Sequence, residues 1–382
     1  MNEEIKKIRI LQSLDSLKIG GNEVFVMNFF RHIDKKKFQI DFIIYDDSEM
    51  EFYDEIITAG STVYVCKSNN HNRYLDILVK IIKVRKILIK NKYDIIHCHG
   101  CSFMGIFRGA IAGHFVGNVK IISHSHNSGI LKNTLFDKTA RYLLKQYLSK
   151  IVDLGFACSD IAAKNKYTDE FMKTEKFSII NNSIDINKFL FDIDIRKEMR
   201  NKYKINDEVV IGNIGRLEEQ KNQKFLLKIF FEIKKRNISA KLIIIGEGVL
   251  NDKLQKYAAE NGIENDVIFT GNVSNSNNYY QMMDIFVLTS IYEGFPFVMV
   301  EAQVNGLSAV VSSNITKSVN ISGDVKFMAL EENEEKWADI ILKSKRKCND
   351  NLDYKKSFRN YDLEYQVRTL ENFYTRLLTD AM

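Results

Sequence analysis

The feature that most constrains the fold is an alternation of short apolar, β-branched runs with helix-like segments, and this alternation occurs twice along the chain. Such alternation is typical of parallel sheets with helices on both faces. The first series of expected strands comprises 8–13, 39–45, 62–66, 94–98, 120–124 and 154–158, and the second comprises 209–213, 240–245, 267–270, 285–288 and 309–312. The sequence therefore predicts two α/β domains, each built on a doubly wound parallel sheet.

The expected domain borders follow from a change of register near residues 183–206. We predict a first domain over residues 1–185 and a second over 186–362. The segment 363–382 is expected to begin with a helix, and no strand follows it.

Composition favours a soluble enzyme with a sizeable core, since 45% of the 382 residues are hydrophobic and 27% are charged. No stretch approaches the ~18 apolar residues of a membrane span, and the first residues lack the apolar core of a secretion signal. Five cysteines are an odd number in a long chain, which favours reduced thiols over a disulfide framework. We therefore expect a cytoplasmic protein.

The net charge of +6 is unevenly distributed. Residues 1–185 contain 27 Lys and Arg against 21 Asp and Glu, whereas the remainder contains 28 of each. The densest segment, 73–92, is expected to be a helix. Its basic face comprises Arg73, Lys80, Lys83, Lys86 and Lys90, and its apolar face comprises Ile77, Leu78, Ile81, Val84 and Leu88.

Two interpretations of this basic helix stay open. The favoured one is a helix that covers the sheet and exposes a solvated basic side. The other is a surface that contacts anionic lipid, where each basic residue contributes about 1 kcal/mol. Aromatic residues do not interleave the charges as in a nucleic-acid groove, so we expect no nucleic-acid partner.

Two carboxylates, Glu293 and Glu301, flank a short apolar segment just past the expected strand 285–288. A strand that ends and leads into a helix places its loop at the carboxyl edge of a sheet, where open α/β folds bind ligands. Pro296 suits the first turn of that helix. A loop carboxylate and a helix carboxylate suit a polyol of two parts, such as a nucleotide sugar, although a surface acid and an ordinary helical Glu would give the same pattern.

The stretch 290–296, running on to 301–306, resembles the signature of retaining GT-B glycosyltransferases of family 4. Further segments resemble the family in the same order, and they are 20–23, 94–99, 182–185, 215–222 and 246–248. Together they span residues from about 8 to 330. Ser308 stands where the family usually has Pro, which alters a turn and affects no site residue. The resemblance implies two Rossmann-like domains facing across a cleft, with the last helix crossing back to the first domain.

The resemblance also implies a role for each domain and for residues of the second. The first domain would bind the acceptor and the second the nucleotide sugar. Arg216 and Lys221 would hold the diphosphate, and Glu301 would bind the ribose hydroxyls. Glu293 would bind the hydroxyls of the transferred sugar, together with the amides of Gly294 and Phe295. Without this context, Arg216 and Lys221 would be ordinary loop charges.

In the first domain, Gly20 and Gly21 lie between an expected strand and an expected helix. Glycine lets the backbone approach a phosphate, and a helix N-terminus favours anions. Alone, this pair would more often be a turn. The resemblance further places His126 near the donor sugar and the diphosphate.

Two His-x-His pairs end neighbouring expected strands, His97 with His99 and His124 with His126. Because alternate strand residues share a face, each pair could point to one place. With Cys98 and Cys101 nearby, a zinc site is conceivable, but the familiar ligand spacings are missing. For His97, His99 and His124 we favour structural roles.

Asp192 and Asp194 form an Asp-x-Asp sequence like that of metal-dependent GT-A transferases, but they precede an expected helix and fit capping better. We predict no bound metal and no cofactor.

The predicted function is a retaining glycosyltransferase of the hexosyl type. It would move a sugar from a nucleotide-diphosphate donor, UDP-linked by preference, to a growing, lipid-linked glycan in surface polysaccharide biosynthesis. The enzyme would be cytoplasmic and peripheral on the inner face of the cytoplasmic membrane. Two alternatives stay open: a nucleotide-sugar 2-epimerase of the same fold, and a catalytically silent partner that stabilises another transferase.

Overall fold

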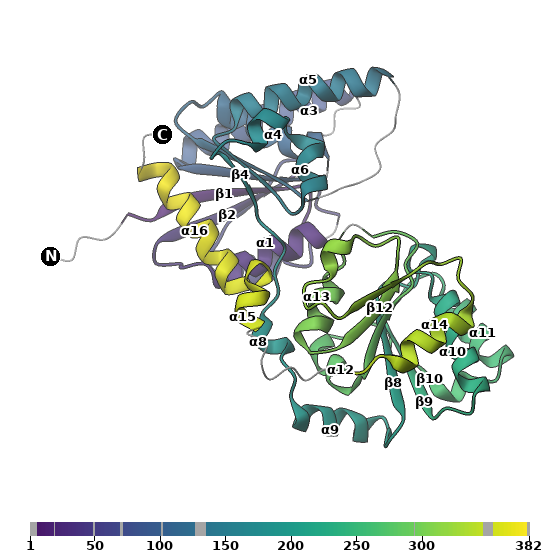
Figure 1. The fold of residues 1–382 in the computed structure, drawn as a ribbon. Coiled ribbons are helices and arrows are strands. Elements are labelled where there is room, and N and C mark those ends of the chain that lie inside the picture. Colours follow the sequence, from purple (N-terminus) through teal and green to yellow (C-terminus); the bar gives the residue numbers. More distant parts are fainter. Residues whose placement is uncertain are drawn as a thin grey trace. The chain divides into compact units, whose positions relative to one another are not determined.

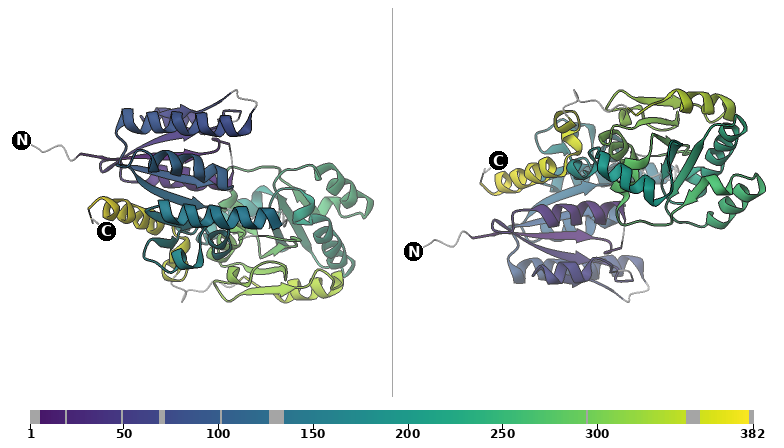
Figure 2. Two further views of the ribbon diagram at one scale, coloured as in Figure 1. Left: turned by 90° about the horizontal axis from the view of Figure 1, so that it is seen from above. Right: turned by 90° about the horizontal axis from the view of Figure 1, so that it is seen from below.

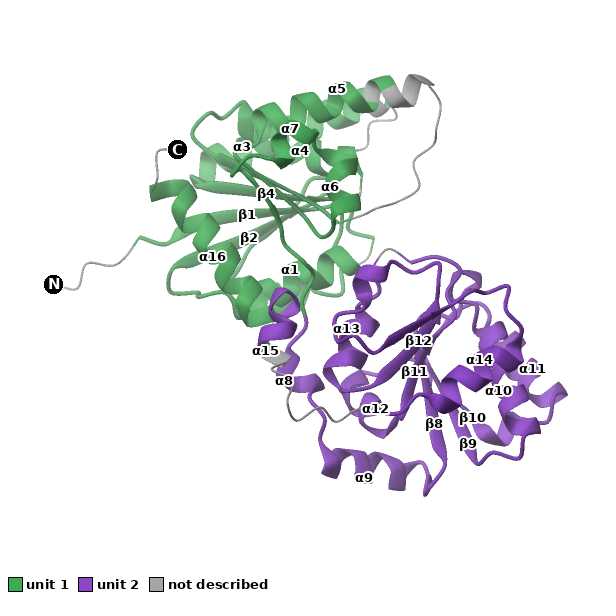
Figure 3. Ribbon diagram, in the orientation of Figure 1, with its two compact units in different colours: residues 1–183, 363–382 green, residues 184–362 purple. Residues whose placement is uncertain are grey.

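The computed structural model describes residues 6–379 except Ile19, Glu49, 69–71, Cys101, 127–134, Gly294 and 347–353. The chain divides into two compact units (Figure 1, Figure 3). Unit 1 comprises residues 1–183 and 363–382, and unit 2 comprises residues 184–362. Each unit is an α/β body with its own sheet and core.

Unit 1 contains a parallel sheet of seven strands in the order β3-β2-β1-β4-β5-β6-β7. The strands are β1 (Ile8–Leu14), β2 (Phe38–Ile44), β3 (Val63–Val65), β4 (Ile95–Gly100), β5 (Lys120–Ser125), β6 (Leu154–Ala157) and β7 (Phe177–Ile179). The strand order reverses between β1 and β4, and ligands of doubly wound folds bind outside the carboxyl ends of the strands at such a point.

Helices cover both faces of this sheet because its strands are buried on both sides. Ile10 of β1 belongs to one core and its neighbour Leu11 to the other. The first core receives α1 (Gly21–His32), α2 (Tyr53–Thr58) and α16 (Leu363–Thr379), whereas the second receives α3 (Arg73–Asn91), α4 (Phe103–His114), α5 (Leu135–Ile151), α6 (Asp160–Lys166) and α7 (Asp169–Met172).

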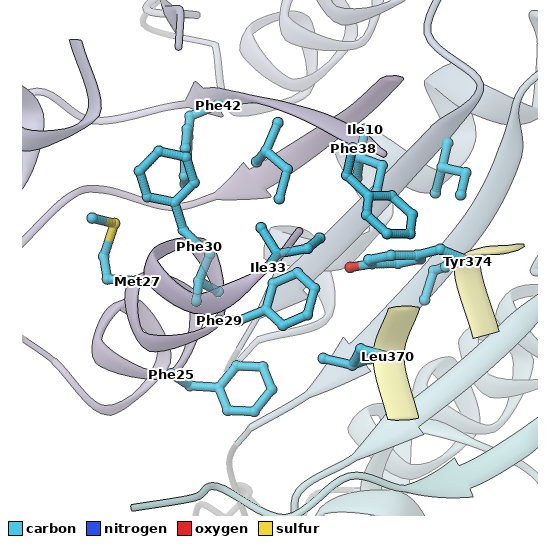
Figure 4. Packing of buried hydrophobic residues seen from close by; sticks show 14 of the residues in the cluster. Ile10, Phe25, Met27, Phe29, Phe30, Ile33, Phe38, Phe42, Leu370 and Tyr374 are labelled. Atoms are coloured by element: carbon cyan, nitrogen blue, oxygen red, sulfur yellow. The ribbon is translucent and has the colours of Figure 1, made fainter. Parts of the chain in front are cut away.

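The last helix, α16, packs on unit 1 and not on the unit that precedes it in sequence. It runs along the side of the first sheet in both further views (Figure 2). Leu370 and Tyr374 point from α16 toward α1, and the ring of Tyr374 lies 5.7 Å from that of Phe29, edge to face (Figure 4). The prediction that the terminal helix returns to the first domain is confirmed.

Unit 2 contains a parallel sheet of six strands in the order β10-β9-β8-β11-β12-β13. The strands are β8 (Val209–Ile214), β9 (Ala240–Ile245), β10 (Val267–Phe269), β11 (Ile285–Leu288), β12 (Ser308–Ser312) and β13 (Val325–Met328). One face is covered by α10 (Gln223–Lys235), α11 (Asn251–Glu260) and α14 (Glu334–Lys343), and the other by α9 (Ile193–Lys202), α12 (Ser276–Met282) and α13 (Phe297–Val304). The short helices α8 (Ile186–Phe189) and α15 (Tyr354–Ser357) complete the unit.

The predicted fold class, two Rossmann-like α/β domains, is confirmed by these two sheets. Each expected strand is present within one or two residues of its predicted ends, but the sequence did not predict β7 or β13. Both are short strands at the edge of a sheet, and a half-buried edge gives only a weak apolar signal. Among the described residues, no helix has both the length and the apolar composition that crossing a membrane requires.

Candidate functional site

An ion pair lies at the carboxyl end of the unit 2 sheet, between the loops that follow β8 and β11. The Nζ of Lys221 is 2.5 Å from Oε1 of Glu293, and the hydroxyl of Ser290 donates to the same oxygen over 2.8 Å. The two side chains are only 15% and 9% exposed, so solvent screens this pair less than a surface pair. The structure therefore brings together two residues that the sequence placed 72 positions apart.

The backbone around Lys221 explains how its side chain is directed toward Glu293. Asn222 takes a left-handed conformation (φ 53°) between the 3-10 turn Glu219–Lys221 and α10. The Lys221 side chain runs across Gly215, where an added Cβ would lie 3.2 Å from its Cε. The hydroxyl of Thr289 donates to the carbonyl of Asn222 over 3.0 Å, which ties the β11 loop to the β8 loop.

Arg216 lies in the same β8 loop but is not drawn into the ion pair. Its side chain is 71% exposed, and Nη1 lies 3.1 Å from a carboxylate oxygen of Glu218. A glycine turn after β9 packs beneath this loop, because Gly246 (φ 132°) leaves no room for a Cβ, which would lie 2.2 Å from the carbonyl oxygen of Gly215. The packing therefore fixes the backbone of the β8 loop at Arg216, whereas the exposed guanidinium has room to turn toward a ligand.

Glu301 lies within α13, where its Oε2 accepts a 2.7 Å hydrogen bond from the hydroxyl of Tyr280 on α12. Burial raises the pKa of Glu301 above its ordinary value, and the Tyr280 hydrogen bond opposes that rise. Sequence reasoning missed Tyr280, because nothing in its local sequence indicates the contact. One oxygen of Glu301 is thus oriented by the protein before any ligand binds.

The turn into α13 differs slightly from expectation. Pro296 is the N-cap residue, so it precedes the first helical turn in which we had placed it. A proline here still costs nothing, because no intrahelical donor is lost. Phe295 stacks on Tyr361 at 5.2 Å, and the predicted ligand Gly294 lies outside the described residues.

In unit 1, Gly20 is the N-cap of α1 and Gly21 is its first residue. A Cβ on Gly20 would lie 2.5 Å from Oε2 of Glu23, so this carboxylate folds back over the glycine. Glu23 is buried, and burial raises its pKa. A carboxylate therefore already occupies the helix N-terminus, where an anion is favoured, and a phosphate would compete with it there.

His126 follows β5, and its Nε2 lies 2.9 Å from Nδ1 of His99 on β4. The other nitrogen of His99 lies 2.7 Å from the amide oxygen of Gln12. Because an amide oxygen only accepts, His99 carries its proton on Nε2, and the neutral ring accepts from the Nε2–H of His126. Burial lowers the pKa of His126 to about 3, so its ring is neutral at neutral pH.

The other two strand-end histidines lie on the same side of the sheet. His97 Nδ1 is 2.7 Å from the hydroxyl of Tyr374, and the rings of His97 and His124 are parallel at 5.6 Å. Burial lowers the pKa of both rings. Among the described residues, His97 Nε2 is buried without a hydrogen-bond partner, and neither nitrogen of His124 makes a well-aligned one, although the Ile180 backbone lies beside that ring. A buried polar group left unpaired costs about 1–3 kcal/mol.

Of the other candidate ligands, Asp192 caps α9 by accepting from the amides of Asp194 and Ile195. The side chain of Asp194 is 85% exposed. This agrees with the capping interpretation. Cys101 lies outside the described residues.

The side chains that α3 exposes differ from those predicted for its basic and apolar faces. Lys80 is only 13% exposed and pairs with Asp76 over 2.9 Å, so it does not belong to the open basic face. Leu78, expected on the buried side, is 53% exposed and is accompanied by Ile82 (46%) and Ile89 (50%). The solvent side of α3 therefore mixes exposed apolar side chains with lysines.

Comparison with known protein families covers both units. Residues 19–188 match the family described as Glycosyltransferase Family 4, and residues 195–360 match that described as Glycosyl transferases group 1. The chain belongs to the family 4 glycosyltransferases. The predicted recognition of this GT-B family is thereby confirmed, and so is a transferase as the coarse activity.

Related proteins match along most of their length. EpsF of Bacillus subtilis, which carries a provisional glycosyltransferase name, is 28% identical over 373 residues, 96% of each chain. An uncharacterised glycosyltransferase of Methanocaldococcus jannaschii is 30% identical over 267 residues, 66% of this chain and 67% of that protein. An Escherichia coli UDP-Gal:α-D-GlcNAc-diphosphoundecaprenol α-1,3-galactosyltransferase is 25% identical over 330 residues, 82% of this chain and 81% of that one.

Among solved structures, Anabaena HepE in complex with UDP is similar, with a TM-score of 0.73 at 19% identity. The alignment covers 97% of this chain and all of HepE. At this level of identity the likeness supports the GT-B fold alone.

Proposed function

We propose that this glycosyltransferase retains anomeric configuration and uses a UDP-linked hexose as donor. The Lys221–Glu293 ion pair carries the proposal, because it sets a cation and a carboxylate side by side at the carboxyl end of the unit 2 sheet, where open α/β folds bind ligands. Two relatives support UDP as the nucleotide, since HepE was solved in complex with UDP and the E. coli galactosyltransferase is named for UDP-Gal.

The proposed chemistry follows from the charge that develops during transfer. Cleavage of the sugar–phosphate bond leaves an oxocarbenium-like sugar and a diphosphate that gains negative charge. Lys221 would turn from Glu293 to the diphosphate, and Arg216 would turn from Glu218 to the same group. Once aimed at a leaving group, such donors contribute about 3–4 kcal/mol each in comparable sites.

Glu293, once released by Lys221, would accept hydrogen bonds from hydroxyls of the transferred sugar, with the amides of Gly294 and Phe295 as donors beside it. Glu301 would bind the ribose through the oxygen that Tyr280 leaves free. From unit 1, we propose that the backbone at Gly20 and Gly21 approaches phosphate.

His126 would donate to the donor sugar, because its neutral ring can turn its Nε2–H away from His99. Retention would follow from attack by the acceptor on the face that the leaving phosphate vacates, with that phosphate taking the acceptor's proton.

We propose a lipid-linked glycan as the acceptor, on a pathway of surface polysaccharide synthesis at the cytoplasmic side of the membrane. The name of the E. coli relative, whose acceptor is a diphosphoundecaprenol-linked sugar, supports this choice. The mixed apolar and basic face of α3 supports a peripheral association with the membrane.

Purified protein incubated with UDP- and GDP-hexoses tests the function. We expect slow UDP release from one UDP-sugar without an acceptor, and faster release when undecaprenyl-diphosphate-linked sugars are added. An epimerised nucleotide sugar with no transfer would instead indicate a 2-epimerase. No turnover of any donor, with or without lipid-linked acceptors, would favour a silent partner protein.

The first prediction concerns metal ions at the diphosphate. Because Lys221 and Arg216 supply positive charge, we expect transfer to proceed without Mg²⁺ or Mn²⁺ and to change less than about twofold when either is added, a span of ~0.4 kcal/mol. The measurement is UDP release in chelator-treated buffer with each ion restored in turn. Activity that requires Mg²⁺ or Mn²⁺ would contradict the prediction and return attention to Asp192 and Asp194.

The second prediction concerns α3 and anionic lipid. Reversing Lys86 and Lys90 to Glu should weaken binding to phosphatidylglycerol vesicles at least about tenfold, given about 1 kcal/mol per basic residue at such a surface. Wild-type binding should weaken as salt rises. Donor hydrolysis should stay unchanged, while transfer to a lipid-linked acceptor should fall. Vesicle co-sedimentation and UDP release provide the measurements.

The matched control for this charge reversal lies on α11 of unit 2. There Lys253 and Lys256 are exposed at similar helical spacing, and their reversal should leave vesicle binding within about twofold. Equal losses in the two double variants would show that net charge and not the α3 face decides binding.

A further inference from the structure

Three histidines of unit 1 form a cluster that the proposed transfer chemistry does not use. His97 and His99 come from β4, and His124 comes from the paired position on β5, where His99 and His124 are register partners. All three side chains are at most 2% exposed. One ring nitrogen from each lies within 4.8 Å of the other two.

The outer nitrogens of two rings are already held by neighbours. The hydroxyl of Tyr374 on α16 is hydrogen-bonded to Nδ1 of His97 over 2.7 Å. The amide oxygen of Gln12 accepts a hydrogen bond from Nε2 of His99, also over 2.7 Å. This leaves Nε2 of His97 and Nδ1 of His99 as the remaining nitrogens. Histidines that bind metals characteristically have one nitrogen fixed in this way while the other coordinates the ion.

Apart from His99 Nδ1, which is hydrogen-bonded to His126, the remaining ring nitrogens of the cluster lack well-aligned hydrogen bonds among the described residues. Among the described residues, His97 Nε2 has no hydrogen-bond partner, and neither nitrogen of His124 makes a well-aligned hydrogen bond, although the Ile180 backbone lies beside that ring and favours its charged form. Aromatic rings enclose the cluster instead, since Phe25 lies 4.9 Å from the His124 ring and Phe156 lies 5.8 Å from it. Native structures rarely leave several buried polar atoms unsatisfied at one place without a water, an ion or a function.

We propose that His97, His99 and His124 bind one transition-metal ion, Zn²⁺ by preference, which fixes β4 to β5. Neutral imidazoles suit zinc, copper, iron and nickel, whereas Mg²⁺ and Ca²⁺ prefer oxygen ligands. The site is thus separate from any ion on the diphosphate, and it departs from our expectation that the chain holds no metal.

The geometry requires a small adjustment. Three ligand atoms at most 4.8 Å apart lie within about 2.8 Å of a common centre, whereas Zn–N distances are about 2.0–2.1 Å, so each ring moves by no more than ~0.7 Å. A hydroxide or water in the fourth position completes the tetrahedron, and a hydroxide also offsets part of the buried charge. Coordination by His99 Nδ1 replaces its hydrogen bond with His126 and frees the Nε2–H of His126 for another acceptor.

The experiment uses untagged, full-length protein, stripped of metal and titrated with Co²⁺. We expect one equivalent to bind with the visible absorption of a tetrahedral Co²⁺ site and to be displaced by Zn²⁺. Elemental analysis of the protein as isolated should find zinc at close to one per chain. Zn²⁺ should raise the melting temperature of the stripped protein.

Two variants test the ligands. His124→Phe and His97→Gln should each abolish the Co²⁺ absorption and the rise in melting temperature with Zn²⁺. His114→Gln, at an exposed histidine of α4, should behave as wild type and exclude surface binding. Wild-type protein that takes up neither Co²⁺ nor Zn²⁺, or variants that bind both ions as wild type does, would overturn the proposal and leave these nitrogens to buried water.

Discussion

Replacing Lys221 by Ala should lower donor turnover about 100-fold, as the loss of one preorganised donor does in comparable sites. Lys221 is the partly buried partner of Glu293, and no other cation lies within 4.0 Å of that carboxylate among the described residues. In the proposed mechanism, the variant therefore loses positive charge at the leaving diphosphate. We expect a lower kcat with a smaller change in KM, measured as UDP release over a range of donor concentrations.

Lys224→Ala is the matched control. This lysine lies on the exposed side of α10, three residues beyond Lys221, and should retain wild-type turnover. Circular dichroism should show both variants folded. A Lys221→Ala enzyme within about threefold of wild type would remove Lys221 from the diphosphate, because a lost donor of this kind costs far more.

Arg216 provides a second variant of the same kind. Its guanidinium is paired with Glu218 on the surface, so Arg216→Ala should reduce turnover about 100-fold only if the side chain turns to the donor. Glu218→Gln removes the surface partner but keeps the arginine, and it should leave turnover near wild type. Equal, small effects of both variants would show that Arg216 is an ordinary surface charge.

Much of the fold could be predicted from the sequence because parallel strands are buried on both faces. Runs such as 242–245 are continuously apolar and rich in β-branched isoleucine. The edge strands β7 and β13 lack this signal because each is half covered. The order of strands in each sheet follows from the doubly wound pattern. The residues at which strands end depend on tertiary packing, which the local sequence does not determine.

The candidate site could be predicted only in part. Glu293 and Glu301 appear in one motif, but the Tyr280 partner of Glu301 comes from another helix, 21 residues earlier. Gln12 and Tyr374 are 362 residues apart and meet beside His97 and His99 only because α16 packs on unit 1. The two His-x-His pairs did indicate a shared face, yet their register was needed to place His99 beside His124.

Glu301→Ala should weaken the binding of UDP itself by about 10- to 100-fold, since hydrogen bonds to a charged group contribute roughly 1.5–3 kcal/mol. The carboxylate is held by Tyr280 at Oε2, and Oε1 is the oxygen that we propose for the ribose. Because burial raises the pKa of Glu301, the carboxylate takes up a proton at a higher pH than an ordinary Glu. UDP affinity in the wild type should therefore fall as pH is lowered through this raised pKa.

Titration calorimetry with UDP across a pH series measures both effects. Tyr280→Phe is the informative comparison, because it removes the hydroxyl that orients Glu301 but keeps the ring in the α12–α13 core. We expect a loss of only a few-fold, consistent with one hydrogen bond of about 1 kcal/mol. In Glu301→Ala the acid-side loss of affinity should disappear, because the titrating group is gone. A Glu301→Ala protein that binds UDP as tightly as wild type, with the same pH profile, would show that the ribose is bound elsewhere.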